Sequence, residues 1–119
     1  MSTLKSTFQQ LSLTKSSKAA YSYIRESDKL PTPDGMMYEH DGGDPVAKVK
    51  LFNPTGAASW YLAAYDPETG IAWGAAFIHE FEIGDIYMPE LVEFRGRFGL
   101  PIERDLHWSP RPLSQCEGS

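Results

Sequence analysis

The fold is decided by residues 46–108, which read VAKVKLFNPTGAASWYLAAYDPETGIAWGAAFIHEFEIGDIYMPELVEFRGRFGLPIERDLHW. This stretch holds all three tryptophans of the 119-residue chain. Residues 46–52 alternate between apolar side chains and lysines, which is the period of a half-buried strand. Residues 59–65 are apolar or aromatic on both faces, as is typical of an inner strand. We therefore predict that a sheet forms the centre of the molecule.

The clearest local signal is the turn Asp66-Pro-Glu-Thr-Gly70. Aspartate can bond to its own backbone, proline fixes φ, and glycine supplies the left-handed residue that a short hairpin loop needs. The turn predicts that residues 59–65 pair antiparallel with residues 71–79. One face of the second run carries mostly small residues, against which we expect a helix to lie closely.

Two helical segments complete the predicted fold. Apolar residues recur at helical spacing over residues 3–27. Residues 89–95 begin with a proline, which fits a first helical turn, and are followed by Gly96. We predict an α+β fold, in which an antiparallel sheet of about three to five strands packs with the N-terminal helical segment and the short second helix. Its last strand spans residues 102–108.

The chain length favours a single domain with three parts. We expect a helical segment and loop over residues 1–45, the sheet core with its short helix over 46–108, and a flexible tail over 109–119. No run is long and apolar enough for a membrane span, and the first residues lack the apolar region of a secretory signal. A single cysteine, Cys116, cannot form a disulfide framework. We therefore expect a soluble cytoplasmic protein that has no membrane partner.

The net charge of -5 is unevenly distributed. No basic residue lies between Lys50 and Arg95, and this interval contains seven acidic ones. They are Asp66, Glu68, Glu80, Glu82, Asp85, Glu90 and Glu93. Such a surface repels phosphates, whereas nucleic-acid binders gather lysine and arginine on one face. Direct nucleic-acid binding is disfavoured, and a protein is the expected partner.

Several sequence blocks resemble one known family. They are KLF at 50–52, Trp60, YDPETGIAWG at 65–74, ELVEFRG at 90–96 and GLPIERDLHW at 99–108. The family consists of small bacterial proteins known only as a domain of unknown function and often found on plasmids and other mobile elements. The resemblance spans about residues 44–112, although Met88 stands where a serine usually precedes the helix. It implies a bacterial, mobile-element or phage-linked context and supplies no catalytic residue.

One grouping has the composition of an enzyme site: His79, Glu82, Asp105 and His107, with Glu80 beside them. If the last strand lies near the end of the 71–79 strand, two imidazoles and a carboxylate would form a facial metal site or an acid–base pair. Alternatively, these residues lie on a solvated edge and prevent it from pairing with another chain. No HExxH spacing supports a metal, and we predict no cofactor.

Arg104 alternates with apolar residues, which predicts partial burial and a need for a carboxylate. Glu90, Glu93 and Asp85 are the candidates for a structural ion pair, and anion binding is the alternative.

Tyr87 belongs to a set of tyrosines and tryptophans that would form a protein-binding surface wherever they stay exposed beside acidic residues.

We predict that the protein is a non-enzymatic binding module. Its acidic and aromatic middle would contact a host or element-encoded protein, for example one with a basic nucleic-acid-binding channel, where an acidic surface competes with DNA. The candidate binding residues are Glu80, Glu82, Asp85, Tyr87 and Arg104. The alternative is a small metal-dependent or acid–base hydrolase that uses His79, Glu82, Asp105 and His107.

Overall fold

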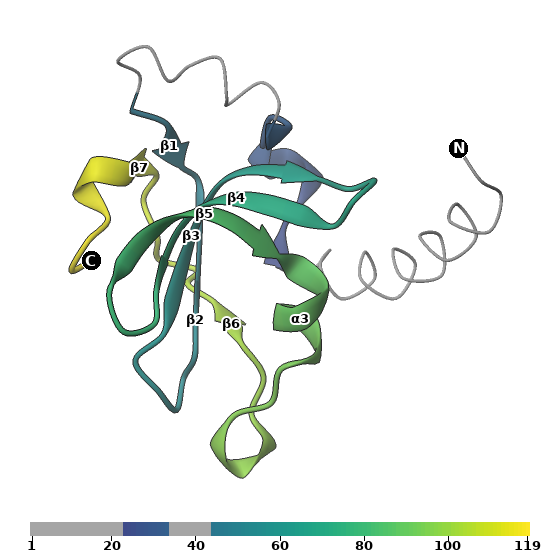
Figure 1. The fold of residues 1–119 in the computed structure, drawn as a ribbon, viewed down its shortest axis with the longest axis vertical. Coiled ribbons are helices and arrows are strands. Elements are labelled where there is room, and N and C mark those ends of the chain that lie inside the picture. The colour runs from purple at the N-terminus through teal and green to yellow at the C-terminus, as the bar shows by residue number, and fades with distance from the viewer. Residues whose placement is uncertain (1–22, 34–43) are drawn as a thin grey trace, which may run out of the picture.

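The structure is a computed structural model that describes residues 23–33 and 44–119. Its centre is an antiparallel five-stranded sheet with the order β5-β4-β3-β2-β6 (Figure 1). The strands are β2 (Val49–Phe52), β3 (Ser59–Asp66), β4 (Ile71–Phe77), β5 (Phe81–Tyr87) and β6 (Glu103–Arg104). A separate two-stranded sheet pairs β1 (Val46–Ala47) with β7 (Arg111–Pro112). The described chain is therefore mostly β.

The β3–β4 hairpin confirms the turn predicted at residues 66–70. Gly70 has a φ of +77°, in the left-handed region, and its N–H donates to the Asp66 carbonyl at 2.8 Å. The Asp66 carboxylate accepts a hydrogen bond from the Glu68 N–H at 2.9 Å. The turn residues act as their local chemistry predicts, so β3 pairs with β4. Because β3 also pairs with β2, it is the middle strand of the sheet.

The predicted α+β class is wrong, because the described residues contain one short α-helix, α3 (Met88–Glu93). Beside it are the 3-10 turns η1 (Glu26–Asp28), η2 (Arg97–Gly99) and η3 (Leu113–Gln115). Most of the helix predicted over residues 3–27 lies outside the described residues. In the part that is described, the chain after Tyr23 leads into η1 instead of continuing as an N-terminal helix.

Other element boundaries also differ from the predictions: the strand predicted over residues 46–52 is split into β1 and β2, and the strand predicted over 71–79 ends at Phe77. α3 ends at Glu93, and the Arg95 guanidinium then donates to the carbonyls of Val92 and Phe94 at 3.0 and 2.7 Å. The strand predicted over 102–108 shortens to β6, because the Asp105 carboxylate accepts the His107 N–H at 2.9 Å and turns the chain. Short polar side chains that bond to nearby backbone compete with strand pairing in this way.

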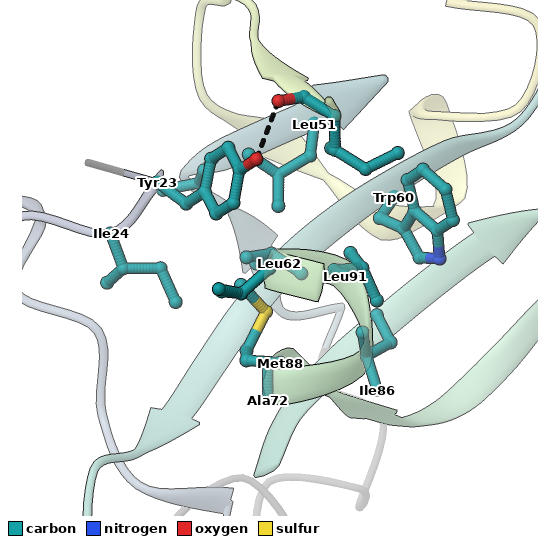
Figure 2. Close-up of a cluster of buried hydrophobic side chains, with 12 residues drawn as sticks. Tyr23, Ile24, Leu51, Trp60, Leu62, Ala72, Ile86, Met88 and Leu91 are labelled. Atoms are coloured by element: carbon teal, nitrogen blue, oxygen red, sulfur yellow. Dashed lines mark hydrogen bonds between the residues drawn. The ribbon is translucent and has the colours of Figure 1, made fainter. Parts of the chain in front are cut away.

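The larger apolar core lies between one face of the sheet, α3 and the segment at residues 23–30 (Figure 2). Its buried members are Tyr23, Ile24, Val49, Leu51, Trp60, Leu62, Ala72, Ile86, Met88, Leu91, Val92 and Ile102. Ala72 belongs to the small-residue face of β4, and α3 packs there through Met88 and Leu91, as we predicted. The Tyr23 hydroxyl donates to the Ile102 carbonyl at 2.7 Å and attaches the N-terminal segment.

The opposite face of the sheet is covered by the C-terminal segment. Residues 109–119, expected to be a tail, contribute β7 and η3. Leu113 and Cys116 are 2% and 0% exposed and pack with Ala75 and Tyr61 of the sheet. The Trp108 indole N–H donates to the Ala47 carbonyl at 3.0 Å.

No helix among the described residues has the length and apolar character that crossing a bilayer requires.

Candidate functional site

The three acidic residues predicted to bind a partner lie along one edge of the main sheet. Glu80 lies in the β4–β5 turn, and Glu82, Asp85 and Tyr87 lie on β5. All four side chains are exposed, Tyr87 at 43%. Among the described strands β5 is outermost, since it pairs with β4 and with no other of them. We call β5 together with the β4–β5 turn the acidic edge. The structure brings four of the five predicted binding residues to this edge.

The direction of the backbone groups on β5 follows from its pairing with β4. The register runs without a shift from Ile71 opposite Tyr87 to Phe77 opposite Phe81. Just beyond it, the Met88 N–H donates to the Gly70 carbonyl at 2.9 Å. Backbone groups alternate in direction along an antiparallel strand. Every second residue of β5, counted back from Met88, therefore faces β4, and the residues between them face away from the sheet.

The outward-facing N–H groups of β5 are those of Phe81, Ile83, Asp85 and Tyr87. None of them donates a hydrogen bond to any residue in the part of the chain that the structure describes. The carbonyls of Ile83 and Asp85 face the same way. An unpaired row of this kind is a template for another strand.

The side chains around the acidic edge combine carboxylates with exposed isoleucines. Ile83 is 57% exposed and Ile78, in the turn, is 54% exposed. A shallow hollow of about 230 Å³ is lined by Ala76, Ile78, His79, Glu80 and Glu82. A smaller one of about 90 Å³ is lined by Ala76 and by residues 82–86. The surface therefore offers apolar contacts between its charges.

The carboxylates of the acidic edge, on Glu80, Glu82 and Asp85, form no ion pair with any described residue. Ion pairs between described residues lie elsewhere, between Lys50 and Asp105 at 3.9 Å and between Arg104 and Asp28 at 2.7 Å. The described structure thus leaves the charge of this edge uncompensated.

Arg104, the fifth predicted binding residue, is held in a structural ion pair. Its guanidinium donates two bonds to the Asp28 carboxylate, at 2.7 and 2.8 Å, and one to the Tyr23 carbonyl at 2.8 Å. The ion pair agrees with one of the two predictions for Arg104, but its partner is Asp28 and not Glu90, Glu93 or Asp85. Because Arg104 is only 15% exposed and bonded on two nitrogens, it is poorly placed to bind a partner.

The ion pair shifts the pKa of both of its members. Burial alone would raise the pKa of Asp28, but the hydrogen bonds from Arg104 and from the Arg25 backbone, with the charges of both arginines, lower it overall. The hydrogen bond to Asp28 likewise raises the pKa of Arg104, against the opposing effect of burial. Both groups are therefore held in their charged forms.

The structure does not bring the predicted enzyme grouping together. His79 and Glu82 lie at the β4–β5 turn and on β5, whereas Asp105 and His107 follow β6 at the opposite side of the sheet, with β3 and β2 between. At roughly 4.8 Å per strand, β4 and β6 are separated by about 14 Å. No three histidine, cysteine or acidic side chains among residues 23–33 and 44–119 are placed to share a metal ion.

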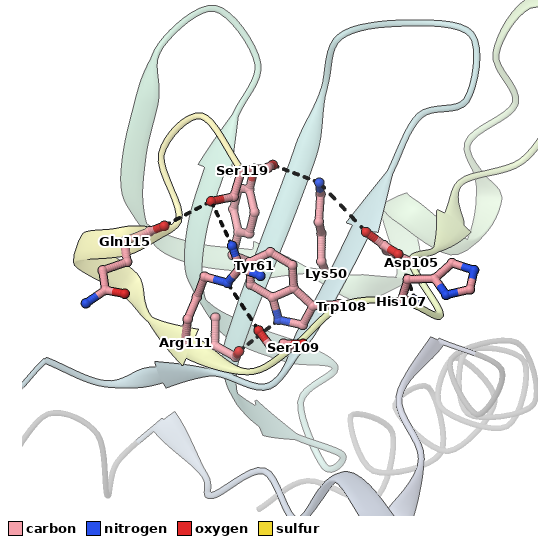
Figure 3. Close-up of polar contacts among 10 residues, drawn as sticks. Lys50, Tyr61, Asp105, His107, Trp108, Ser109, Arg111, Gln115 and Ser119 are labelled. Carbon is pink, nitrogen blue, oxygen red and sulfur yellow. Dashed lines mark hydrogen bonds and ion pairs between the residues drawn. The ribbon is translucent and has the colours of Figure 1, made fainter.

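A second cluster, which we did not predict, lies on the face covered by the C-terminal segment (Figure 3). The Lys50 ammonium lies 5.7 Å from the ring centres of both Tyr61 and Trp108, and the Arg111 guanidinium lies 4.1 Å from the Trp108 ring. Lys50 and the Tyr61 hydroxyl both donate to the Ser119 carbonyl, at 2.8 and 2.9 Å. These contacts fasten the last residues to the sheet.

No local sequence pattern predicts this cluster. Lys50 reads as a solvated residue of an alternating strand, and Arg111 lies in a segment that reads as a tail. They meet through β-sheet pairings that join residues about sixty positions apart. The donors and rings of the cluster are satisfied within the chain, so we regard it as structural.

Comparison with known proteins places the chain in a family. A model described as "Protein of unknown function (DUF2958)" matches residues 24–116, which is well over half of the chain. Neither the curated proteins nor the solved structures include a match.

Proposed function

The chain belongs to the DUF2958 family of proteins of unknown function, and we propose that it is a non-enzymatic protein-binding module. In this proposal the acidic edge contacts a basic surface of another protein. The observation that carries it is the combination of three exposed carboxylates, on Glu80, Glu82 and Asp85, with no ion pair to any described residue. Charges that no described residue pairs with are available to a complementary partner.

The chemistry of the edge indicates the class of partner. Carboxylates along one sheet edge attract lysine and arginine and speed association at low ionic strength. Exposed Ile78, Ile83 and Tyr87 add apolar and aromatic area, which a protein partner uses and a mobile counterion does not. We propose a basic, nucleic-acid-binding protein of the host or of a mobile element, because the carboxylates would compete there with phosphates.

The resemblance in the sequence supports the biological setting that we propose. It suggests a bacterial protein linked to a plasmid, another mobile element or a phage. That the protein acts in the cytoplasm is a separate part of the proposal. The hydrolase alternative has no comparable support. His79 lies in the β4–β5 turn and His107 follows β6 beyond the other side of the sheet, and no three described histidine, cysteine or acidic side chains are placed to hold a metal ion.

Affinity capture from a bacterial lysate tests the proposal. The bait is compared with the triple variant Glu80→Lys, Glu82→Lys, Asp85→Lys at low and high salt. A matched control reverses three other exposed acids, in the variant Glu26→Lys, Glu68→Lys, Glu117→Lys. We expect a basic protein that is captured at low salt by the wild type and by the control, and that is lost with the edge variant. Equal capture by all three baits would refute the proposal.

A further inference from the structure

The two edges of the main sheet differ in how open they are. β6 is two residues long, and the chain beyond it folds back on β2, where the Asp105 N–H donates to the Lys50 carbonyl at 3.0 Å. β5 is seven residues long and pairs with β4 over its whole length without a bulge. Its outward N–H groups donate to no described residue. The β5 edge is therefore the one to which another strand can be added.

We propose that β5 binds its partner by strand addition, with an extended basic segment of the partner as a sixth strand of the sheet. This inference rests on the proposed function and specifies how the same edge would be used. Main-chain hydrogen bonds to Ile83 and Asp85 would supply affinity, and the side chains on both faces of β5 would supply specificity.

The middle of β5 is shaped for the approach of another backbone. Gly84 has no side chain, and a Cβ added there would meet no atom within 4 Å. The strand contains no proline, so none of its outward N–H groups is missing. The hollow of about 90 Å³ beside residues 82–86 lies along the same edge. A neighbouring strand therefore meets no steric barrier from β5 itself.

The carboxylates of β5 favour a partner strand that carries lysine or arginine. Glu82 and the buried Ile86 lie on the α3 side of the sheet, whereas Ile83 and Asp85 lie on the opposite side, because side chains alternate along a strand. A partner strand thus meets a carboxylate on each face. Lysine or arginine opposite these carboxylates, with an apolar residue near Ile83, would form favourable cross-strand pairs.

A second copy of the chain is a poor occupant of this edge. Pairing β5 with itself would place the Glu82 and Asp85 carboxylates of both copies on adjoining strands, and β5 contains no basic residue to pair with them. Like charges on neighbouring strands are unfavourable. Acidic residues on an edge are a common defence against self-association. Here the same charges exclude copies of the chain and still admit a basic segment.

Two synthetic peptides of equal charge test strand addition directly. One alternates lysine with valine over eight residues, and the other replaces every valine with proline, which cannot pair as a strand. Binding to the full chain is followed by NMR titration. We expect the lysine–valine peptide to bind at least about tenfold more tightly, because only it can form the main-chain bonds.

Amide hydrogen exchange resolves the mode of binding. The lysine–valine peptide should slow exchange at the N–H groups of Phe81, Ile83, Asp85 and Tyr87. Those of Glu82, Gly84 and Ile86 already face β4 and should change little. Ile83→Pro removes one outward donor without removing a bond to β4, and should reduce the affinity to that of the lysine–proline peptide.

The outcomes separate the two proposals. Equal binding of both peptides, lost in the edge charge-reversal variant, would overturn strand addition and leave the acidic docking surface standing. Binding of neither peptide, or binding without the alternating protection on β5, would also overturn strand addition. The capture experiment with its charge-matched control decides the proposed function independently, because it does not depend on how the partner is held.

Discussion

At the scale of single residues, the Asp28–Arg104 pair joins two parts of the chain that lie far apart in sequence. Arg104 on β6 bonds both to Asp28 and to the Tyr23 carbonyl, so it holds the N-terminal segment over the main core. Both side chains are mostly buried, at 15% and 11% exposure. Removing one member of such a pair leaves the other charge buried and unpaired, which costs more than the pair itself contributes.

We predict that Asp28→Asn lowers the free energy of unfolding by about 2–4 kcal/mol at pH 7. Urea denaturation followed by tryptophan fluorescence would measure the change. Glu26→Gln removes an exposed neighbouring acid and should change stability by less than about 0.5 kcal/mol. Similar losses in the two variants would contradict a specific role for the ion pair.

The same pair predicts a dependence on pH. The pKa of Asp28 is lower in the folded chain than its ordinary value of 3.8. A carboxyl whose folded pKa is depressed stabilises the protein above its unfolded pKa, and this contribution disappears as the pH falls through the folded pKa. The stability difference between wild type and Asp28→Asn should therefore be constant at neutral pH and shrink below about pH 4. A difference that grows on acidification would contradict the assignment.

Phe98 is a residue whose conformation costs stability. It has a φ of +61°, which non-glycine residues rarely adopt, and its side chain is 87% exposed at the tip of η2. We predict that Phe98→Gly raises the free energy of unfolding by about 0.5–1 kcal/mol, because glycine takes this φ without strain. Phe94→Gly is the control. Phe94 has an ordinary φ of -61°, so glycine there should destabilise the chain. A loss of stability in both Phe98→Gly and Phe94→Gly would refute the claim that the backbone is strained at Phe98.

At the scale of elements, the sequence predicted those parts of the fold whose signal is local. The β3–β4 hairpin followed from five consecutive turn residues, and the short helix followed from Pro89 and the apolar residues after it. The last strand was predicted too long, because Asp105 turns the chain with its own side chain. The helix predicted over residues 3–27 fails in the described structure from Ile24 onward, where the chain leaves the α-helical conformation and leads into the 3-10 turn η1.

The C-terminal segment shows why non-local elements escape sequence analysis. Its composition is polar, and only two of its residues, Leu113 and Cys116, are buried. They are held by β7 pairing with β1, a strand of two residues more than sixty positions earlier. The sequence predicts β1 only as the start of one strand over residues 46–52, and β7, with two residues, carries no periodic pattern. The pairing of β1 with β7 therefore cannot be predicted from the sequence until the position of the main sheet is known.

Burial of this segment predicts the reactivity of its cysteine. Cys116 is a free thiol with no exposed surface, and burial raises its pKa, partly offset by the charge of Arg111. At neutral pH it should be a protonated thiol, which is a weak nucleophile. We predict that iodoacetamide labels Cys116 slowly in the native protein and rapidly in urea, as mass spectrometry would show.

A second variant tests whether packing causes this protection. Leu113→Ala opens space beside Cys116 and should cost about 2–4 kcal/mol of stability and speed labelling. Rapid labelling of the native wild type would show that the C-terminal segment does not stay on the sheet. In that case the contacts of Lys50 and Tyr61 with Ser119 would not contribute to stability.

At the scale of the whole molecule, the sequence predicted the negative charge of the candidate site but not its position on an open strand edge. The run from Lys50 to Arg95 without a basic residue gave an acidic surface directly from the sequence. The open edge depends on strand order, which places β5 outermost and β3 in the middle. The same order separates His79 from His107. Arg104 was grouped with the surface because its buried partner, Asp28, lies outside the stretch that carries the pattern.

The charge distribution makes a last prediction about stability. In the variant Glu80→Lys, Glu82→Lys, Asp85→Lys, each reversal adds two units, so the formal net charge changes from -5 to +1. The three side chains are exposed and form no ion pair with described residues. We therefore expect the free energy of unfolding to change by less than about 1 kcal/mol, since unpaired surface charges contribute little to folding. Urea denaturation at low and high salt would measure it. A loss above about 2 kcal/mol would mean that these carboxylates hold the fold together. They could then no longer be regarded as a surface that is free for a partner.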